Sequence, residues 1–164
     1  MRSILISARI AILVLAVSPF GPTAAAPRCY PKNRFVVTDG MVQDTLTQLV
    51  WQQDGSGTRA GCSGTDNLTC TWAEAKAFCG ALSLGGLSGW RLPTYKELIS
   101  IVDFAVASPG STINQTAFPN TPAEYFWTSS PYAGLSGFAW IVSFGKGYPA
   151  TIDGGLVSRV RCVR

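Results

Sequence analysis

The chain has 164 residues, of which 47% are hydrophobic and 13% are charged, and its formal net charge is +4. The length suits one domain with a core of its own, and the low charge gives no indication of nucleic-acid binding. Histidine is absent, which excludes Ser-His-Asp and Cys-His catalytic machinery.

Residues 1–25 have the pattern of a secretory signal peptide. Arg2 and Arg9 give a positive start, residues 10–17 are apolar, and small residues with a Thr23-Ala24-Ala25 cleavage pattern follow. The apolar run is too short to anchor the protein in a bilayer. We therefore predict an exported protein without a membrane anchor, in the periplasm, at the cell surface or in the medium. Removing Arg2 and Arg9 lowers the formal charge from +4 to +2.

The first strands are predicted after an extended lead-in at residues 26–34, at the start of a domain over 35–164. Residues 35–37 are strand-like, and Asp39-Gly40 is a turn sequence. A hairpin follows, with strands at 41–43 and 48–52 around a four-residue turn. Residues 54–70 form a polar loop.

Two helices are each indicated by a cap and by an apolar stripe. Thr71 and Glu74 have the spacing of a capping box, and Thr94 and Glu97 repeat it. Apolar residues recur at helical intervals after both caps. The predicted helices extend from the first cap to about residue 82, and from residue 95 to about 104.

Trp90 is predicted to be a buried anchor between the two helices. A Gly-rich run at 84–89 allows the backbone to turn sharply before it. A large aromatic side chain at that point favours burial. Pro93 then disfavours helix at the residue before it, so that the second helix begins after Thr94.

The second half of the mature chain is predicted to be mostly strand. Residues 109–122 are irregular, and strands are expected at 125–129, 139–144, 150–152 and 157–163. The order is strands, helices, strands, without βαβ alternation. This order favours an α+β fold with an antiparallel sheet.

All five cysteines remain after cleavage, in a compartment that permits disulfides. Cys62 and Cys70 flank a polar loop and could close it. Cys79 on the first helix and Cys162 on the last strand could close a long loop, worth about 4–5 kcal/mol in the chain-entropy model. Cys29 is then left unpaired. No C-x-x-C pair exists, and no zinc or other cofactor is expected.

Six sequence blocks, in order, resemble a bacterial domain family named for the C-terminal domain of the Legionella collagen-like adhesin. The blocks cover nearly the whole mature chain, from about residue 35 to 164. They are DTLTQLVWQ (44–52), TWAEA (71–75) with Cys79, GWRLPTYKEL (89–98), FPNT (118–121), YFWTSS (125–130) and RVRCVR (159–164).

The resemblance implies a C-type-lectin-like fold with two helices, a small antiparallel sheet and a long loop-rich region, related in fold to the formylglycine-generating and sulfatase-modifying group. It also implies a bridge from the first helix to the last strand, which matches Cys79 and Cys162. The founding adhesin is held to bind sulfated glycosaminoglycans. The collagen-like repeat of that adhesin is absent from this chain.

Catalytic and metal sites are not expected. Glu74 and Glu97 could be imagined as a glycosidase pair, but their cap positions explain them more simply. Ser129-Ser130 has no evident base. The oxygen-bearing residues available for calcium are scattered along the chain, and the calcium-binding triplets of C-type lectins are absent. These residues are Asp103, Asn114, Asn120 and Glu124.

The candidate binding residues are aromatic or basic and lie in or beside the predicted loops and the last strand. Tyrosine and phenylalanine can stack on a sugar ring, and arginine matches the oxygens of a sulfate group. Four tryptophans, at positions 72, 90, 127 and 140, are more simply explained as core. The candidates are Tyr125, Tyr132, Phe138, Lys146, Tyr148, Arg159 and Arg161.

The leading functional hypothesis is a secreted, non-enzymatic recognition or adhesion module, with glycans or sulfated polysaccharide as candidate ligands. The alternative is a structural or protein-binding exported domain without glycan affinity, in which Cys29 could join two chains. A more remote alternative is the relic of a formylglycine-generating enzyme. The sequence indicates no oligomeric state.

Overall fold

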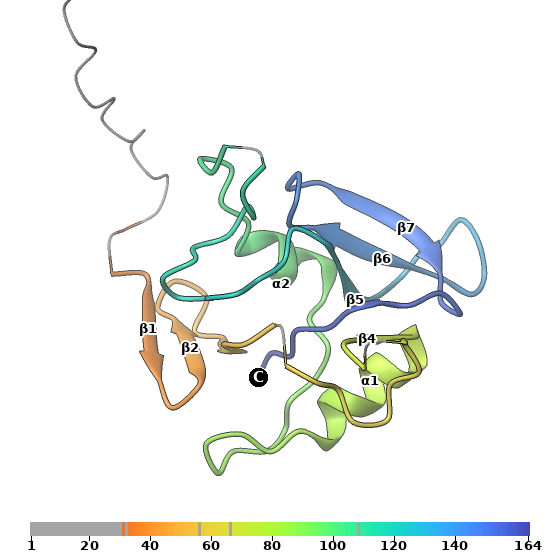
Figure 1. Ribbon diagram of the computed structural model, residues 1–164, viewed down its shortest axis with the longest axis horizontal. Helices are drawn as coiled ribbons and strands as arrows, with labels where there is room; N and C mark the ends of the chain where they lie inside the picture. Colours follow the sequence, from red (N-terminus) through yellow and green to blue (C-terminus); the bar gives the residue numbers. More distant parts are fainter. Residues whose placement is uncertain (1–30, 32, 56, 66, 108) are drawn as a thin grey trace, which may run out of the picture.

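A computed structural model describes residues 31, 33–55, 57–65, 67–107 and 109–164. The predicted signal peptide, Cys29 and most of the predicted lead-in lie outside the described residues. The described chain is an α+β structure with two helices and eight strands (Figure 1). In chain order these are β1 (Phe35–Thr38), β2 (Met41–Asp44), β3 (Val50–Gln52), β4 (Thr69–Cys70), α1 (Trp72–Ala81), α2 (Tyr95–Ser100), β5 (Tyr125–Pro131), β6 (Phe138–Ser143), β7 (Pro149–Asp153) and β8 (Ser158–Arg159).

The first sheet is antiparallel and has the order β1-β2-β3. The predicted turn between β1 and β2 is confirmed, with Asp39 and Gly40 both at positive φ. The C-terminal segment lies along the free side of β3, because the amide of Val50 donates to the carbonyl of Arg164 and that of Gln52 to Cys162. Figure 1 accordingly shows the C terminus between the two sheets.

The second sheet has the order β4-β8-β5-β6-β7. The predicted strands of the second half are present, but the sheet is not purely antiparallel, because β8 pairs with β5 in parallel. The strand expected at 157–163 is reduced to β8. The residues after it leave the sheet, and Val163 instead forms bridges with Trp51 and Arg91. β4 is an element that the sequence analysis assigned to a loop.

Both predicted capping boxes are present. Thr71 and Thr94 each accept a hydrogen bond from the amide of the glutamate three residues on, and each glutamate accepts one from the amide of its threonine. α1 ends at the expected place, whereas α2 is one turn shorter than predicted. The reason is tertiary, since the amide of Asp103 donates to the carbonyl of Thr112 and no longer to the helix.

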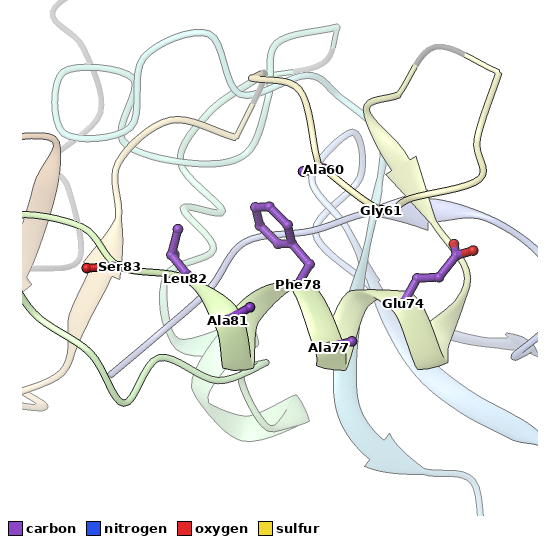
Figure 2. Close-up of a pocket in the computed structure, with 8 residues that line it drawn as sticks. All are labelled: Ala60, Gly61, Glu74, Ala77, Phe78, Ala81, Leu82 and Ser83. Carbon is purple, nitrogen blue, oxygen red and sulfur yellow. The ribbon is translucent and has the colours of Figure 1, made fainter.

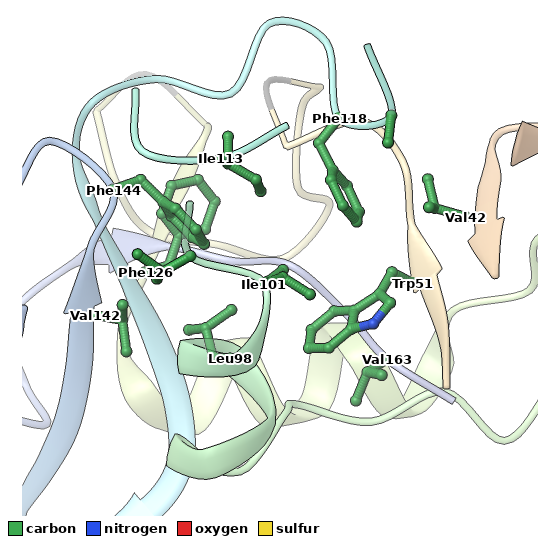
Figure 3. Packing of buried hydrophobic residues seen from close by; sticks show 12 residues of the cluster. Val42, Trp51, Leu98, Ile101, Ile113, Phe118, Phe126, Val142, Phe144 and Val163 are labelled. Carbon is green, nitrogen blue, oxygen red and sulfur yellow. The ribbon is translucent and has the colours of Figure 1, made fainter. Parts of the chain in front are cut away.

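The two helices lie against opposite faces of the second sheet. Side chains alternate along β6, so that Ala139 and Ile141 pack in the cluster of α1, whereas Val142 packs in the cluster of α2. Figure 3 shows Leu98 of α2 close to Val142 and Phe126, and Trp51 close to Val163 at the junction with the first sheet. Val163 and Trp51 thus join the two sheets through one apolar core.

The predicted anchor and the two disulfides lie on the α1 side of the core. Trp90 is 2% exposed, and its indole N–H donates to the carbonyl of Leu87 at 3.0 Å. Cys79 on α1 is bonded to Cys162 with an Sγ–Sγ distance of 2.03 Å. A second disulfide joins Cys62 to Cys70. Trp90, Cys79 and Cys162 belong to one buried cluster, so the long-range disulfide and the anchor stabilise the same region.

The cap of α2 is expected to make stability depend on pH in the acid range. The Arg91 guanidinium donates two hydrogen bonds to Glu97, at 2.8 and 2.6 Å, and lowers the pKa of that carboxyl to about 2. A lowered folded-state pKa stabilises the fold above the ordinary carboxyl pKa, and this contribution is lost as pH falls from about 4.5 towards 2. Chemical denaturation at several pH values should therefore show a smaller acid loss of stability in Glu97→Gln than in the wild type.

Two variants check the cause of this pH dependence. Arg91→Gln removes the partner and should also reduce the acid loss. Lys96→Gln changes an exposed neighbour that takes no part in the cap, and it should retain the wild-type profile. A Glu97→Gln profile that follows the wild type would contradict the assignment.

Candidate binding surface

The structure divides the predicted binding residues into three groups. Tyr125 begins β5, and Lys146 and Tyr148 lie at the turn between β6 and β7, so these three are neighbours at one end of the sheet. Tyr132 and Phe138 lie at the opposite end of the β5–β6 hairpin, roughly 20 Å away along β5. Arg159 and Arg161 belong to β8 and the segment after it.

Tyr125 and Tyr148 form a pair of exposed rings. Tyr125 is opposite Ser143 in the β5–β6 pairing, and the amide of Ser143 donates to the carbonyl of Tyr148. Their hydroxyl oxygens are 3.2 Å apart. Tyr125 is 38% exposed and Tyr148 is 41% exposed. The hydrogen bond to Tyr148 raises the pKa of Tyr125, which favours the uncharged phenol at that position. The pair offers two aromatic faces to solvent.

Phe104 and Lys146 extend this pair into a larger surface. Phe104 follows α2 and is 72% exposed, the highest exposure among the large hydrophobic residues described. It lies against Gly147, where a Cβ would be only 2.9 Å from Cε1 of Phe104. The Nζ of Lys146 is 5.9 Å from the centre of the Tyr148 ring. Phe104, Tyr125, Lys146 and Tyr148 are called the Tyr125–Tyr148 surface below.

Arg159 borders this surface, but its charge is already engaged. Its side chain is largely buried, and it donates to both carboxylate oxygens of Glu124, at 2.7 and 3.2 Å. Arg159 is opposite Phe126 in the parallel pairing of β8 with β5, which puts it beside the start of β5. Glu124 therefore offsets part of the positive charge that a bound anion would meet there.

Arg161 contributes to the core rather than to a surface. It is fully buried, and its guanidinium donates to the carbonyls of Gln52 and Gln53 and to the hydroxyl of Thr121. It also packs on the ring of Phe118, 4.7 Å from the ring centre. Burial lowers its pKa to about 9, which still leaves it charged at physiological pH. The two arginines are thus only two residues apart, but Arg161 is fully buried and Arg159 is partly exposed.

A separate cleft lies between α1 and the loop that precedes β4. It comprises two cavities of about 360 and 580 Å³, both lined by Ala60, Gly61, Phe78 and Leu82. Figure 2 shows Phe78 of α1 pointing towards Ala60, with Leu82 on the same side at the end of the helix.

The charged groups at this cleft are engaged within the protein. Glu74 accepts hydrogen bonds from the amide and hydroxyl of Ser63 and from the amide of Thr71. The terminal nitrogens of Arg59 donate to backbone carbonyls, including those of Asp54 and Val160. The cleft therefore has few polar groups left with which to orient a ligand.

The acidic and amide residues considered for metal or acid–base chemistry also have structural partners. Asp103 caps the amide of Ala105, and Asn114 caps those of Thr116 and Ala117. Among the described residues, no group of three or more histidine, cysteine, aspartate or glutamate side chains is placed to hold a metal ion. These contacts account for Asp103 and Asn114 as caps within loops, and Glu124 is paired with Arg159.

Sequence reasoning missed Phe104 as a surface residue. It placed Phe104 at the end of the second predicted helix and did not name it as a candidate binding residue. The only available signal was that Phe104 lies outside the stripe of Leu98, Ile101 and Val102, all three of which are buried. A residue off the apolar stripe of a helix faces solvent, and a phenylalanine there is unusual.

Comparison with known families gives one match. Residues 40–164, more than half of the chain, match the family model of the Lcl C-terminal domain. The matched region begins just before β2 and includes every residue of the Tyr125–Tyr148 surface. A search of curated proteins finds no match. Within the described residues, neither helix has the length and apolarity needed to cross a membrane.

Proposed function

We propose, on the premise that this chain belongs to the Lcl C-terminal domain family, that it is an exported recognition module that binds sulfated polysaccharide at the Tyr125–Tyr148 surface. The family is one of collagen-like adhesin domains, so binding to surface partners is the role expected of its members. The proposal includes export by the predicted signal peptide and does not include catalysis. Two disulfides suit an exported protein.

The proposed architecture is C-type-lectin-like. Three features support it: two helices on a mostly antiparallel sheet, a disulfide from α1 to the C-terminal segment, and contact between the start and the end of the domain. A long segment leads from α2 to β5, and its described residues, 101–107 and 109–124, contain no helix or strand. In such an architecture the loops are free to carry binding residues while the core and the disulfides hold them in place.

The observation that carries the proposal is the combination of exposed aromatic rings with a lysine. The three rings of Phe104, Tyr125 and Tyr148 leave apolar faces in water, which the C–H groups of a sugar ring can cover. Lys146 stands beside Tyr148 and can donate to a sulfate oxygen. Stacking and one charge-assisted contact together match a sulfated sugar better than a free anion.

Heparin affinity chromatography tests the proposal. The wild type should be retained at physiological salt, and the double variant Tyr125→Ala/Tyr148→Ala should bind about tenfold more weakly because both stacking faces are lost. Lys146→Gln should elute at lower salt than the wild type, because it removes one charge contact. Lys96→Gln removes an exposed lysine elsewhere on the protein and should behave as the wild type.

Two outcomes would overturn this assignment. Elution of the wild type in the flow-through would remove sulfated polysaccharide as the ligand. Equal weakening by Lys96→Gln and Lys146→Gln would show that only the overall charge matters. Exposed tyrosines also occur in protein interfaces, so capture of a protein by the same surface, with no heparin retention, would favour the partner-binding alternative.

A further inference from the structure

Trp140 differs from the other four tryptophans in the state of its indole N–H. The indoles of Trp72, Trp90 and Trp127 donate to backbone carbonyls at 2.7 to 3.0 Å. The indole N–H of Trp51 is buried without a partner. That of Trp140 has no acceptor among the described residues and is not one of the buried unpaired donors, so it is at least partly accessible to solvent.

Two tyrosines flank Trp140 on the surface of the second sheet. The Tyr95 ring lies 5.5 Å from the Trp140 ring at an angle of 38°. The Tyr132 ring lies at the same distance but at 87°, so Tyr132 and Trp140 form a right-angled corner. Trp140 and Tyr95 are half-buried, and Tyr132 is 38% exposed.

The three rings have polar groups that no described residue uses. No described residue bonds the phenol groups of Tyr95 and Tyr132, and the indole N–H of Trp140 is also available. Thr151, partly exposed on the edge strand β7, is opposite Trp140 in the β6–β7 pairing. An apolar partner packed on these rings would leave the donors without acceptors, which costs free energy.

We propose that Trp140, Tyr95 and Tyr132 form a second ligand site, which binds a neutral pyranose ring. The C–H face of the sugar covers the aromatic corner, and the indole N–H of Trp140 donates to a ring hydroxyl. A sugar satisfies both properties of the site, because each face of a pyranose is apolar while its rim carries hydroxyl groups. This mode of binding requires no charged side chain.

This site is separate from the Tyr125–Tyr148 surface. Tyr132 lies at the opposite end of the β5–β6 hairpin from Tyr125, and Trp140 lies within β6. The two sites also use different chemistry, since only the first has a lysine. The inference rests on the proposed carbohydrate role for the class of ligand, but its structural basis does not involve the first surface. A single domain with both sites would bind a polysaccharide that has sulfated and neutral sugars.

The indole resonance of Trp140 in a ¹H–¹⁵N spectrum tests the site directly. Trp140→Phe identifies that resonance and retains an aromatic ring against Tyr95. Cellohexaose, a neutral β-linked glucose oligomer, should move this resonance in a saturable manner and leave the other four indole resonances in place. Tyr132→Ala removes one wall of the corner at an exposed position, and it should weaken binding about fivefold to tenfold while the spectrum of the core is unchanged.

The results separate this inference from the proposed function. Tyr125→Ala/Tyr148→Ala should lose heparin binding and keep the cellohexaose response. If the wild type is not retained on heparin but its Trp140 resonance still moves with cellohexaose, only the first proposal is overturned. An unmoved Trp140 resonance at saturating cellohexaose, or an equal affinity for cellohexaose in Tyr132→Ala, would overturn the second.

Discussion

Replacing Cys79 and Cys162 by alanine is expected to lower the free energy of unfolding by about 4–5 kcal/mol. The disulfide spans 83 residues, and the chain-entropy model predicts a loss of that size when such a long loop is opened. Both cysteines are fully buried beside Trp90, so the variant also loses packing in the same cluster. Urea denaturation followed by tryptophan fluorescence measures the loss directly.

The second disulfide is the matched control for this prediction. Cys62 and Cys70 are only eight residues apart, for which the same model predicts about 2–3 kcal/mol. The Cys62→Ala/Cys70→Ala variant should therefore unfold at a higher urea concentration than the Cys79→Ala/Cys162→Ala variant. An equal loss from the two pairs would show that loop length does not determine the contribution of the long-range disulfide.

Arg161→Met is expected to destabilise the protein by about 3 kcal/mol or more. Methionine can replace the packing on Phe118, but it leaves two backbone carbonyls and the hydroxyl of Thr121 without their donor. Each buried polar group that loses its partner costs about 1–3 kcal/mol. Thermal unfolding should show the loss, and the folded fraction at physiological temperature should fall.

Arg159→Met is the control, because it changes the same residue type two positions earlier. Arg159 pairs with the half-exposed Glu124, and such surface ion pairs are worth about 0–1 kcal/mol. The two variants should therefore differ by 2 kcal/mol or more. Equal stability of the two variants would contradict the structural role assigned to Arg161.

This contrast has a consequence for tests of ligand binding. A variant that removes both Arg159 and Arg161 would lose heparin retention through loss of the folded state. Lys146 and the two tyrosines of the first surface are exposed and can be replaced without opening the core. Binding is therefore best tested at these residues, with Arg159 as the only arginine changed.

Local signals in the sequence were sufficient for the helices, the turn and most strands. Both capping boxes depend on residues three positions apart, and the Asp39-Gly40 turn depends on two adjacent residues. Such contacts form within one turn of chain, so the sequence pattern alone indicates them.

Long-range contacts decided the features that the sequence analysis missed. α2 ends early because Asp103 pairs with Thr112, and the last strand is short because Val163 crosses to Trp51 and Arg91. The short strand β4 exists only because β8 lies beside it. None of these pairings has a signal in the neighbouring residues.

The candidate sites show the same division. Residue type in the sequence determined which side chains have the chemistry for a ligand, namely tyrosine, tryptophan, lysine and arginine. The tertiary structure alone decided which of them meet. It brought Phe104 against Gly147 beside Tyr148, buried Arg161 completely while leaving Arg159 partly exposed, and left the indole N–H of Trp140 at least partly accessible to solvent. The physical reason is that burial and hydrogen-bond partners come from segments distant in the chain, which a local pattern does not encode.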